Sequence, residues 1–300
     1  MTAHKRTRSA ESTHSAESTH SASAAEEHKR VRAASHSEND DSEPESEPEA
    51  GETVDVDFEF FDPKPIDFHA IKRLLMAGMG DDAEDFDLSQ LTDLVLEQNT
   101  IGSTVKMDGD LDPYAFLTVV NMQHHREKQV IEQITQYLLK KAGVHREYLR
   151  RVFETDTVGL LLNERLVNMP PQVVAPMLRM LVEELQWAVD DGEPYRFDYY
   201  LVLAPMYRET QATQDGESSS SSRAPALQGA MLDAYVHAED EFIEEFACLK
   251  FDYRFSRSKR AAESRNAFAD TGLVPLRRCL LIKNDRIPAM LERLDSVLQA

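Results

Sequence analysis

The stretch VGLLLNERLVNMPPQVVAPMLRM, residues 158–180, decides the fold. It opens with an uninterrupted apolar run, Val158–Leu162, which is typical of a central strand covered on both faces of a sheet. The pair Pro170-Pro171 starts a helix that we expect to reach about Val189, although Pro176 must kink that helix or shift its start. Because Phe197–Ala204 favours a further strand, this part of the chain predicts a strand–helix–strand unit.

Hydrophobic periodicity predicts the remaining elements on either side of this unit. Strands are predicted at Val54–Phe60, Thr100–Lys106, Tyr114–Met122, Phe246–Phe255 and Leu276–Ile282. Helices are predicted at Phe68–Gly78 with Asp67 as its cap, Gln90–Asn99 opened by Ser89, Glu127–Ala142 ended by Gly143, His145–Glu154 and Arg286–Leu298. This order favours an α/β (α+β) fold, a single helix-covered mixed sheet whose strands lie mainly in pairs. It resembles the acetyltransferase fold of the GNAT superfamily, a topological analogy that does not fix function.

The first 52 residues differ in composition from the rest of the chain. They contain Val31 but no Leu, Ile or aromatic residue, and the hexapeptide AESTHS occurs twice in tandem. Such a segment cannot bury enough apolar area to offset its ordering entropy, so we predict a disordered low-complexity tail over residues 1–52. The folded domain is then expected over 53–300, with a disordered serine-rich loop at about 208–226.

The charge balance is strongly acidic throughout. The net charge is −21, of which the tail contributes six basic and twelve acidic residues and the remainder 27 and 42. An acidic surface disfavours direct binding of nucleic acid and attracts basic partners over long range. No run of about 18 apolar residues occurs, so we expect no membrane span. The two cysteines, Cys248 and Cys279, are expected to be reduced and buried, as in a nuclear or cytosolic protein.

The tail holds two kinds of candidate signal. Its short basic clusters are candidate nuclear import elements: Lys5, Arg6, Arg8, Lys29, Arg30 and Arg32. Residues 37–62 contain twelve acidic residues and no basic one. This block is either a contact surface for a basic partner or a solubilising linker. Its candidate contacts are Glu38, Asp40, Asp41, Glu43, Glu45, Glu47 and Glu49.

A leucine pattern lies in the second predicted helix. Leu88, Leu91, Leu94 and Leu96 have the spacing of a nuclear export signal, and equally that of the apolar stripe of an amphipathic helix. The stripe is the stronger interpretation, because an export receptor needs the leucines exposed.

Catalytic and cofactor motifs are not found in the sequence. It has no nucleophile elbow, phosphate-binding loop, dinucleotide fingerprint or zinc-protease motif. The turn expected to cradle acetyl-CoA phosphates, residues 123–126, lacks glycine, so we predict no cofactor. Asp108–Asp112 begins like a calcium loop, but Pro113 and Val119 stand where that loop needs Gly and Glu. The rings of His124 and His125 are expected to point apart, so no metal site is predicted.

Six collinear blocks together resemble the BCCIP family, a group of nuclear, non-enzymatic binding and escort proteins. They are VDVDF (54–58), LEQNTIGSTVK (96–106), FLTVVNM (116–122), GLLLNERLVNMPPQ (159–172), EDEFIEEF (239–246) leading into LKF (249–251), and PLRRCLLI (275–282). The resemblance runs from about residue 54 to 298 and leaves the tail outside. It implies a GNAT-like fold without a working cofactor site and a location in the nucleus, with shuttling to the cytoplasm.

The resemblance also implies partners. Fungal-type members look like chaperones for a large-subunit ribosomal protein and adaptors for nuclear export of a lipid kinase; animal members bind a cyclin-dependent-kinase inhibitor and a recombination mediator. We therefore expect a chaperone for a basic client, a ribosomal protein, in ribosome biogenesis. The alternative is an export adaptor that binds nuclear transport receptors and a lipid kinase. Candidate contacts of the domain are Asn99, Lys106, Glu164, Arg165 and Asn168.

Overall fold

Strand β4, Val158–Arg165, lies in the middle of one mixed sheet, as its apolar run predicts. The computed structural model describes residues 57–98, 100–107, 110–209, 233–257 and 273–298. Strand order is β1-β2-β3-β4-β5-β8-β7, and β6 pairs with β5. The other strands are β1 (Phe58–Phe61), β2 (Ser103–Met107), β3 (Ala115–Asn121), β5 (Tyr199–Glu209), β6 (Asp233–Tyr235), β7 (Ala247–Tyr253) and β8 (Leu273–Lys283).

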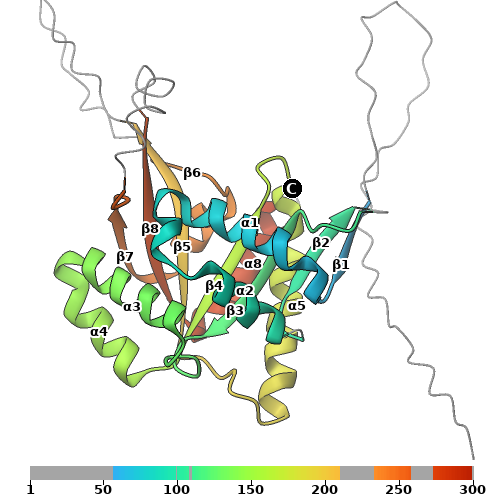
Figure 1. Ribbon diagram of the computed structural model, residues 1–300, viewed down its shortest axis with the longest axis horizontal. Coiled ribbons are helices and arrows are strands. Elements are labelled where there is room, and N and C mark those ends of the chain that lie inside the picture. The colour runs from blue at the N-terminus through green and yellow to red at the C-terminus, as the bar shows by residue number, and fades with distance from the viewer. Residues whose placement is uncertain (1–56, 99, 108–109, 210–232, 258–272, 299–300) are drawn as a thin grey trace, which may run out of the picture.

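Helices cover both faces of the sheet, so the molecule has three layers (Figure 1). The first face carries α1 (Phe68–Met79), α2 (Leu88–Glu97), α3 (Gln129–Lys141) and α4 (Arg146–Thr155). The second face carries α5 (Val174–Asp190), α6 (Glu239–Glu244) and α8 (Ile287–Leu298). Alternate residues of β3 serve the two cores: Phe116 and Val120 pack on the first face, Leu117 and Val119 on the second.

Neighbouring strands are antiparallel except at one position within the described residues. Val158–Leu160 of β4 pairs in parallel with Tyr199–Leu201 of β5, and α5 lies between them in the chain. The predicted mixed sheet of mainly paired strands is therefore confirmed. Pro176 lies in the first turn of α5, where its missing N–H breaks no helical hydrogen bond, so it shifts the helix start and not the path.

The turn before β2 depends on a glycine. Gly102 has φ of +103°, and a Cβ there would lie 2.4 Å from the Leu117 carbonyl oxygen. Its N–H donates to Glu184 Oε2 of α5 at 2.7 Å. The TIGSTVK block therefore contacts both β3 and helix α5 of the second face at Gly102.

The two predicted helix starts differ in part from the structure. Helix α2 begins at Leu88, and Asp87 accepts the Gln90 N–H at 3.0 Å, so Ser89 does not open it. Asp67 stands at the N-cap position of α1 as predicted, but its side chain makes no capping hydrogen bond, because its carboxylate accepts the Lys64 N–H at 2.9 Å and a hydrogen bond from Lys106 Nζ at 2.7 Å instead.

Other differences concern element limits and exposure. Strand β5 continues to Glu209, beyond the predicted start of the serine-rich loop, while residues 210–232 lie outside the described residues. Strand β6 and helix α6 were not predicted. Both cysteines are free, but Cys248 is exposed where burial was expected. His124 and His125 pack edge to face at 4.7 Å and do not point apart, because they lie in turns and not in a regular element.

The predicted strand at Val54–Phe60 is represented by β1, whose residues are all half-buried; Phe58 and Phe60 pack against the second core. Residues 54–56, the tail over 1–52, and Asp108 and Gly109 lie outside the described residues. No helix of the described part is long and apolar enough to cross a membrane.

Candidate functional site

A gap opens in the sheet where β4 and β5 diverge. One edge of β5 pairs with β8 over its whole length, Tyr199–Glu209. The other edge pairs with β4 only at Tyr199–Leu201 and with β6 at Met206–Arg208. Residues 202–205 therefore face neither strand, and Pro205, which has no N–H to leave unsatisfied, suits this position.

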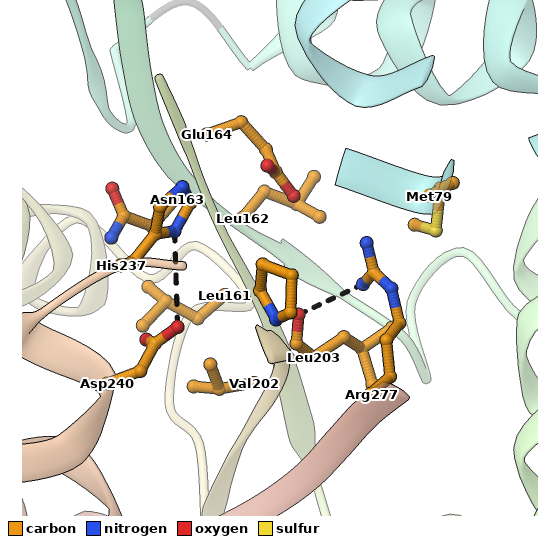
Figure 2. Close-up of a pocket in the computed structure, with 11 residues that line it drawn as sticks. Met79, Leu161, Leu162, Asn163, Glu164, Val202, Leu203, His237, Asp240 and Arg277 are labelled. Carbon is orange, nitrogen blue, oxygen red and sulfur yellow. Dashed lines mark hydrogen bonds and ion pairs between the residues drawn. The ribbon is translucent and has the colours of Figure 1, made fainter. Parts of the chain in front are cut away.

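A cavity of about 20 Å³ occupies this gap, large enough for about one water molecule. Figure 2 shows its lining, which comes from α1, β4, β5, β8, α6 and the segment before α6. The polar lining residues are Asn163, Glu164, His237, Asp240 and Arg277. Ionisable side chains rarely gather in a protein interior, so this cluster is the candidate site of the described structure.

Arg277 of β8 closes one side of the cavity. The residue is 2% exposed, and its Nη1 donates to the Leu203 carbonyl oxygen in the gap at 3.0 Å. Within the described residues its Nε and Nη2, and the hydroxyl of Tyr253 opposite it on β7, have no hydrogen-bond partner. Nε and Nη2 form the guanidinium edge that matches a carboxylate or a water oxygen.

The adjacent Arg278, in contrast to Arg277, uses its guanidinium donors in hydrogen bonds to the acidic side chains that surround it. Its guanidinium donates to Asp252 at 2.5 Å, to Asp233 at 2.8 Å and to Glu244 at 2.6 Å. These bonds join β6, α6, β7 and β8. Burial alone would raise the pKa of Asp252, but the hydrogen bonds from Arg278 and Arg208 hold it below its ordinary value. Arg278 is thus a structural connection, and Arg277 is the arginine with unused donors.

Glu164 of β4 lines the same cavity (Figure 2). Burial raises the pKa of its carboxyl to about 7, and the charges of Arg277 and Arg165 offset only part of that effect. A Cβ on Gly78 of α1 would lie 2.0 Å from Glu164 Oε1, so the glycine leaves the space that this carboxyl fills. A glycine inside a helix costs about 1 kcal/mol relative to alanine, and here the cost has a packing reason.

Arg165, the next residue of β4, forms a buried ion pair with Glu239 at the start of α6. Arg165 Nη2 donates to Glu239 Oε2 at 2.8 Å, Nη1 donates to Oε1, and Asn163 Nδ2 also donates to Oε1 at 2.8 Å. Glu239 is fully buried. Removing one partner of such a pair typically costs about 3–5 kcal/mol, so this contact holds α6 against the central strand.

His237 and Asp240 complete the cluster. Burial lowers the pKa of His237 to about 4, and burial followed by the charge of Glu239 raises the pKa of Asp240 well above its ordinary value. His237 is therefore neutral near pH 7, and burial favours the protonated form of Asp240; His237 Nδ1 and Asp240 Oδ2 lie 4.0 Å apart. The cavity beside these groups admits little more than water. Among the described residues no three His, Cys, Asp or Glu side chains are placed to hold a metal.

The candidate partner contacts of the domain lie mostly inside it. Lys106 pairs with buried Asp67, Glu164 belongs to the cavity cluster, and Arg165 pairs with buried Glu239. Asn168 is exposed in the turn after β4, next to exposed Leu166 and Val167. Asn99, the acidic candidates from Glu38 to Glu49 and the six basic import candidates lie outside the described residues.

The leucines of the candidate export signal line the first core. Leu88, Leu91 and Leu94 are buried, and Leu96 is half-buried against the same core. In the folded chain a receptor could not reach the first three.

The only parallel strand pair of the described sheet indicates a different location for a phosphate-binding turn from the one that we predicted. A phosphate site of an α/β fold lies where a parallel strand leads into its crossover helix. In this structure that place is the turn between β4 and α5, residues 166–173. Residues 123–126 instead follow β3, whose pairing with β4 is antiparallel. Residues 166–173 also contain no glycine.

The residues that pattern reasoning missed are Arg277, His237 and Asp240. A signal existed for the first, because PLRRCLLI places two arginines inside an otherwise apolar strand. Charged residues at such positions indicate buried ion pairs or a polar site.

Comparison with known proteins gives one consistent result. The family model described as BCCIP matches residues 53–243. Protein bcp1 of Aspergillus oryzae is 39% identical over 255 residues, covering 82% of this chain and 88% of that protein. Protein bcp1 of Schizosaccharomyces pombe is 39% identical over 258 residues, covering 82% and 91%. The crystal structure of BCP1 from Saccharomyces cerevisiae shares the fold at a TM-score of 0.57 and 23% identity, covering 81% and 89%.

Proposed function

The chain belongs to the BCCIP family, and on this premise we propose that it is a non-enzymatic nuclear binding protein that escorts a basic client. The client we propose is a large-subunit ribosomal protein, held before its assembly into the ribosome. Such proteins carry dense positive charge for binding RNA, and an acidic partner can cover that charge until it is needed.

The observation that carries the proposal is the charge of the folded part. Residues 53–300 hold 27 basic and 42 acidic residues. Buried pairs such as Arg165–Glu239 and Lys106–Asp67 cancel within the fold, so they leave this acidic excess unchanged. A surface of this sign speeds encounter with a basic protein and repels RNA, which suits an escort that must release its client to RNA.

The test is an affinity pull-down with the full-length tagged protein from nuclear and cytosolic fractions, at two salt concentrations. We expect one basic ribosomal protein at near-stoichiometric amount in the nuclear fraction at low salt, and its loss at high salt. An unrelated tagged protein of similar net negative charge is the control for simple ion exchange. The absence of any near-stoichiometric basic protein, or its equal capture by the control, would contradict the proposal.

A further inference from the structure

Arg277 differs from three other basic side chains that lie inside the described fold. Lys106 and Arg165 each pair with a buried carboxylate, and Arg278 pairs with three acidic side chains. Arg277 is 2% exposed, yet it forms no ion pair with an acidic side chain of the described residues. A buried charge without a counter-ion is unfavourable, because it has lost its hydration and gained no partner in return. The fold therefore calls for a negative charge beside Arg277.

The unused donors of Arg277 lie at the cavity between β4 and β5. Its Nη1 donates to the Leu203 carbonyl oxygen at 3.0 Å, whereas Nε and Nη2 have no partner within the described residues. Figure 2 shows Nη2 turned toward the side of the cavity that Glu164 and Met79 line. The two N–H groups on one edge of a guanidinium converge on a common acceptor, so this edge suits a single negatively charged atom.

A further unused donor stands next to this edge. Tyr253 lies opposite Arg277 in the β7–β8 pair, and its buried hydroxyl also has no hydrogen-bond partner among the described residues. Residues directly opposite each other in an antiparallel pair share one face of the sheet, so the hydroxyl and the guanidinium lie on the same side. What this part of the interior lacks is an acceptor.

The cavity restricts the size of that acceptor. It measures about 20 Å³, which is space for about one water molecule. Polyatomic anions such as phosphate or a carboxylate are too large for it, whereas chloride is a single atom only a little larger than water. The apolar side chains of Met79, Leu162 and Val202 form much of the remaining lining, so a bound ion would be shielded from solvent.

Glu164 is the alternative counter-ion within the chain. It lines the same cavity, but Figure 2 marks no ion pair between it and Arg277. Burial raises the pKa of its carboxyl to about 7, so near neutral pH much of it is protonated and cannot neutralise the guanidinium. A water molecule would accept the N–H groups but carries no charge. An anion would do both.

We propose that the Nε–Nη2 edge of Arg277 binds a monatomic anion, chloride under physiological conditions, in the cavity between β4 and β5. The ion accepts charge-assisted hydrogen bonds from the guanidinium and supplies the missing negative charge. Met79 of α1, Leu162 of β4 and Arg277 of β8 line this one cavity, so the ion stabilises the sheet where β4 and β5 diverge. This inference does not depend on the escort function.

Thermal unfolding of the full-length protein tests the site. Chloride is raised from about 5 to about 200 mM in exchange for gluconate, whose anion is too large for the cavity, at constant ionic strength. The net charge of −21 opposes binding of any anion, so we expect a dissociation constant on the order of 10 mM. The melting temperature of wild type should then rise by about 2–5 °C. Arg277→Met should lose this rise, and Arg196→Met, which removes an exposed arginine, should keep it.

Glu164→Gln separates binding at this cavity from general effects of the salt. At pH 8 the Glu164 carboxyl of wild type is mostly ionised and repels an anion, whereas glutamine is neutral. Asp240 and His237 line the same cavity but are present in both proteins. The rise in melting temperature with chloride at pH 8 should therefore be larger in Glu164→Gln than in wild type, and the two should differ less at pH 6.

Bromide locates the ion directly. Crystals of the wild-type protein grown in sodium bromide should give an anomalous difference peak within hydrogen-bonding distance of Arg277 Nε and Nη2. A water molecule there without anomalous signal, or a direct ion pair between Arg277 and Glu164, would overturn the proposal, as would an equal rise in melting temperature for wild type and Arg277→Met. If Arg277→Met does not fold, the bromide peak in wild type decides alone.

Discussion

Among single residues, Glu164 has the most distinctive chemistry. Its carboxyl is buried beside Gly78, and its pKa is raised from the ordinary value of 4.5 to about 7, chiefly by burial. The folded state therefore binds this proton more tightly than the unfolded state. The resulting stability is fully present below about pH 4.5, is lost as the pH rises to about 7, and stays absent above it.

Glu164→Gln keeps this position neutral at every pH. The free energy of unfolding of the variant should exceed that of wild type by up to about 3 kcal/mol above pH 7, and the difference should vanish below about pH 4.5. Urea unfolding of both proteins from pH 4.5 to 8 measures it. His237 titrates in the opposite sense, losing stability as the pH falls from 6.5 toward 4, but this loss is common to both proteins. A difference that does not change with pH would show that Glu164 is not protonated in the fold.

Lys106, Glu164 and Arg165 were predicted to contact a partner because they belong to the blocks that resemble the BCCIP family. The structure instead places each among buried groups. The reason is that their partners are distant in the sequence. Arg165 pairs with Glu239, which is 74 residues away, and Lys106 pairs with Asp67, which is 39 residues away. Periodicity describes neighbours within one element and carries no information about such pairs, so the cavity cluster could not be assembled from pattern alone.

Among elements, α2 was predicted with two open interpretations of its leucines. In the structure Leu94 is 1% exposed, whereas Leu96 is half-buried. If α2 is a core helix, Leu94→Ala should lower the free energy of unfolding by about 2–5 kcal/mol and Leu96→Ala by clearly less.

Urea denaturation of the two variants measures this, and fluorescence imaging of the tagged chains separates the alternatives. A Leu94→Ala protein that keeps wild-type stability and accumulates in the nucleus would contradict the core interpretation and favour an export signal.

Long periodic elements were predicted well and short acidic ones were not. Helix α3 and strand β4 follow from their apolar patterns, with ends that differ by a few residues. Helix α6, with the sequence EDEFIE, has too few apolar residues to show a helical period. It is held by tertiary contacts, above all Arg165 with Glu239, which local propensity does not contain.

On the scale of the whole molecule, the net charge of −21 acts against compactness. Like charges lie closer together in the folded chain than in the unfolded one, and salt screens exposed charges far more than buried pairs. The free energy of unfolding should therefore rise by about 1 kcal/mol between about 20 mM and 300 mM NaCl.

Urea is the denaturant for this measurement, because guanidinium is itself a salt. A fall in stability with salt would mean that exposed attractive pairs, such as Arg257 with Glu84, outweigh the general repulsion.

The class of fold and the family were accessible from the sequence, and both are confirmed: one mixed, helix-covered sheet, and BCCIP membership from collinear blocks. The place of the parallel pair was not accessible, because strand order depends on which distant segments meet. The likeness to acetyltransferases stays a prediction.

The order of the strands in space also differs from their order of synthesis. Strand β8 lies between β5 and β7 and is translated after both. A nascent chain that has emerged through Tyr253 therefore holds β7 without its only neighbour in the described sheet, and the long edge of β5 stays unpaired until Leu273–Lys283 follows. Unpaired edges of this kind are where incomplete chains associate wrongly. A protein that we propose as an escort thus passes, during its own translation, through a stage in which it is itself vulnerable to misassembly.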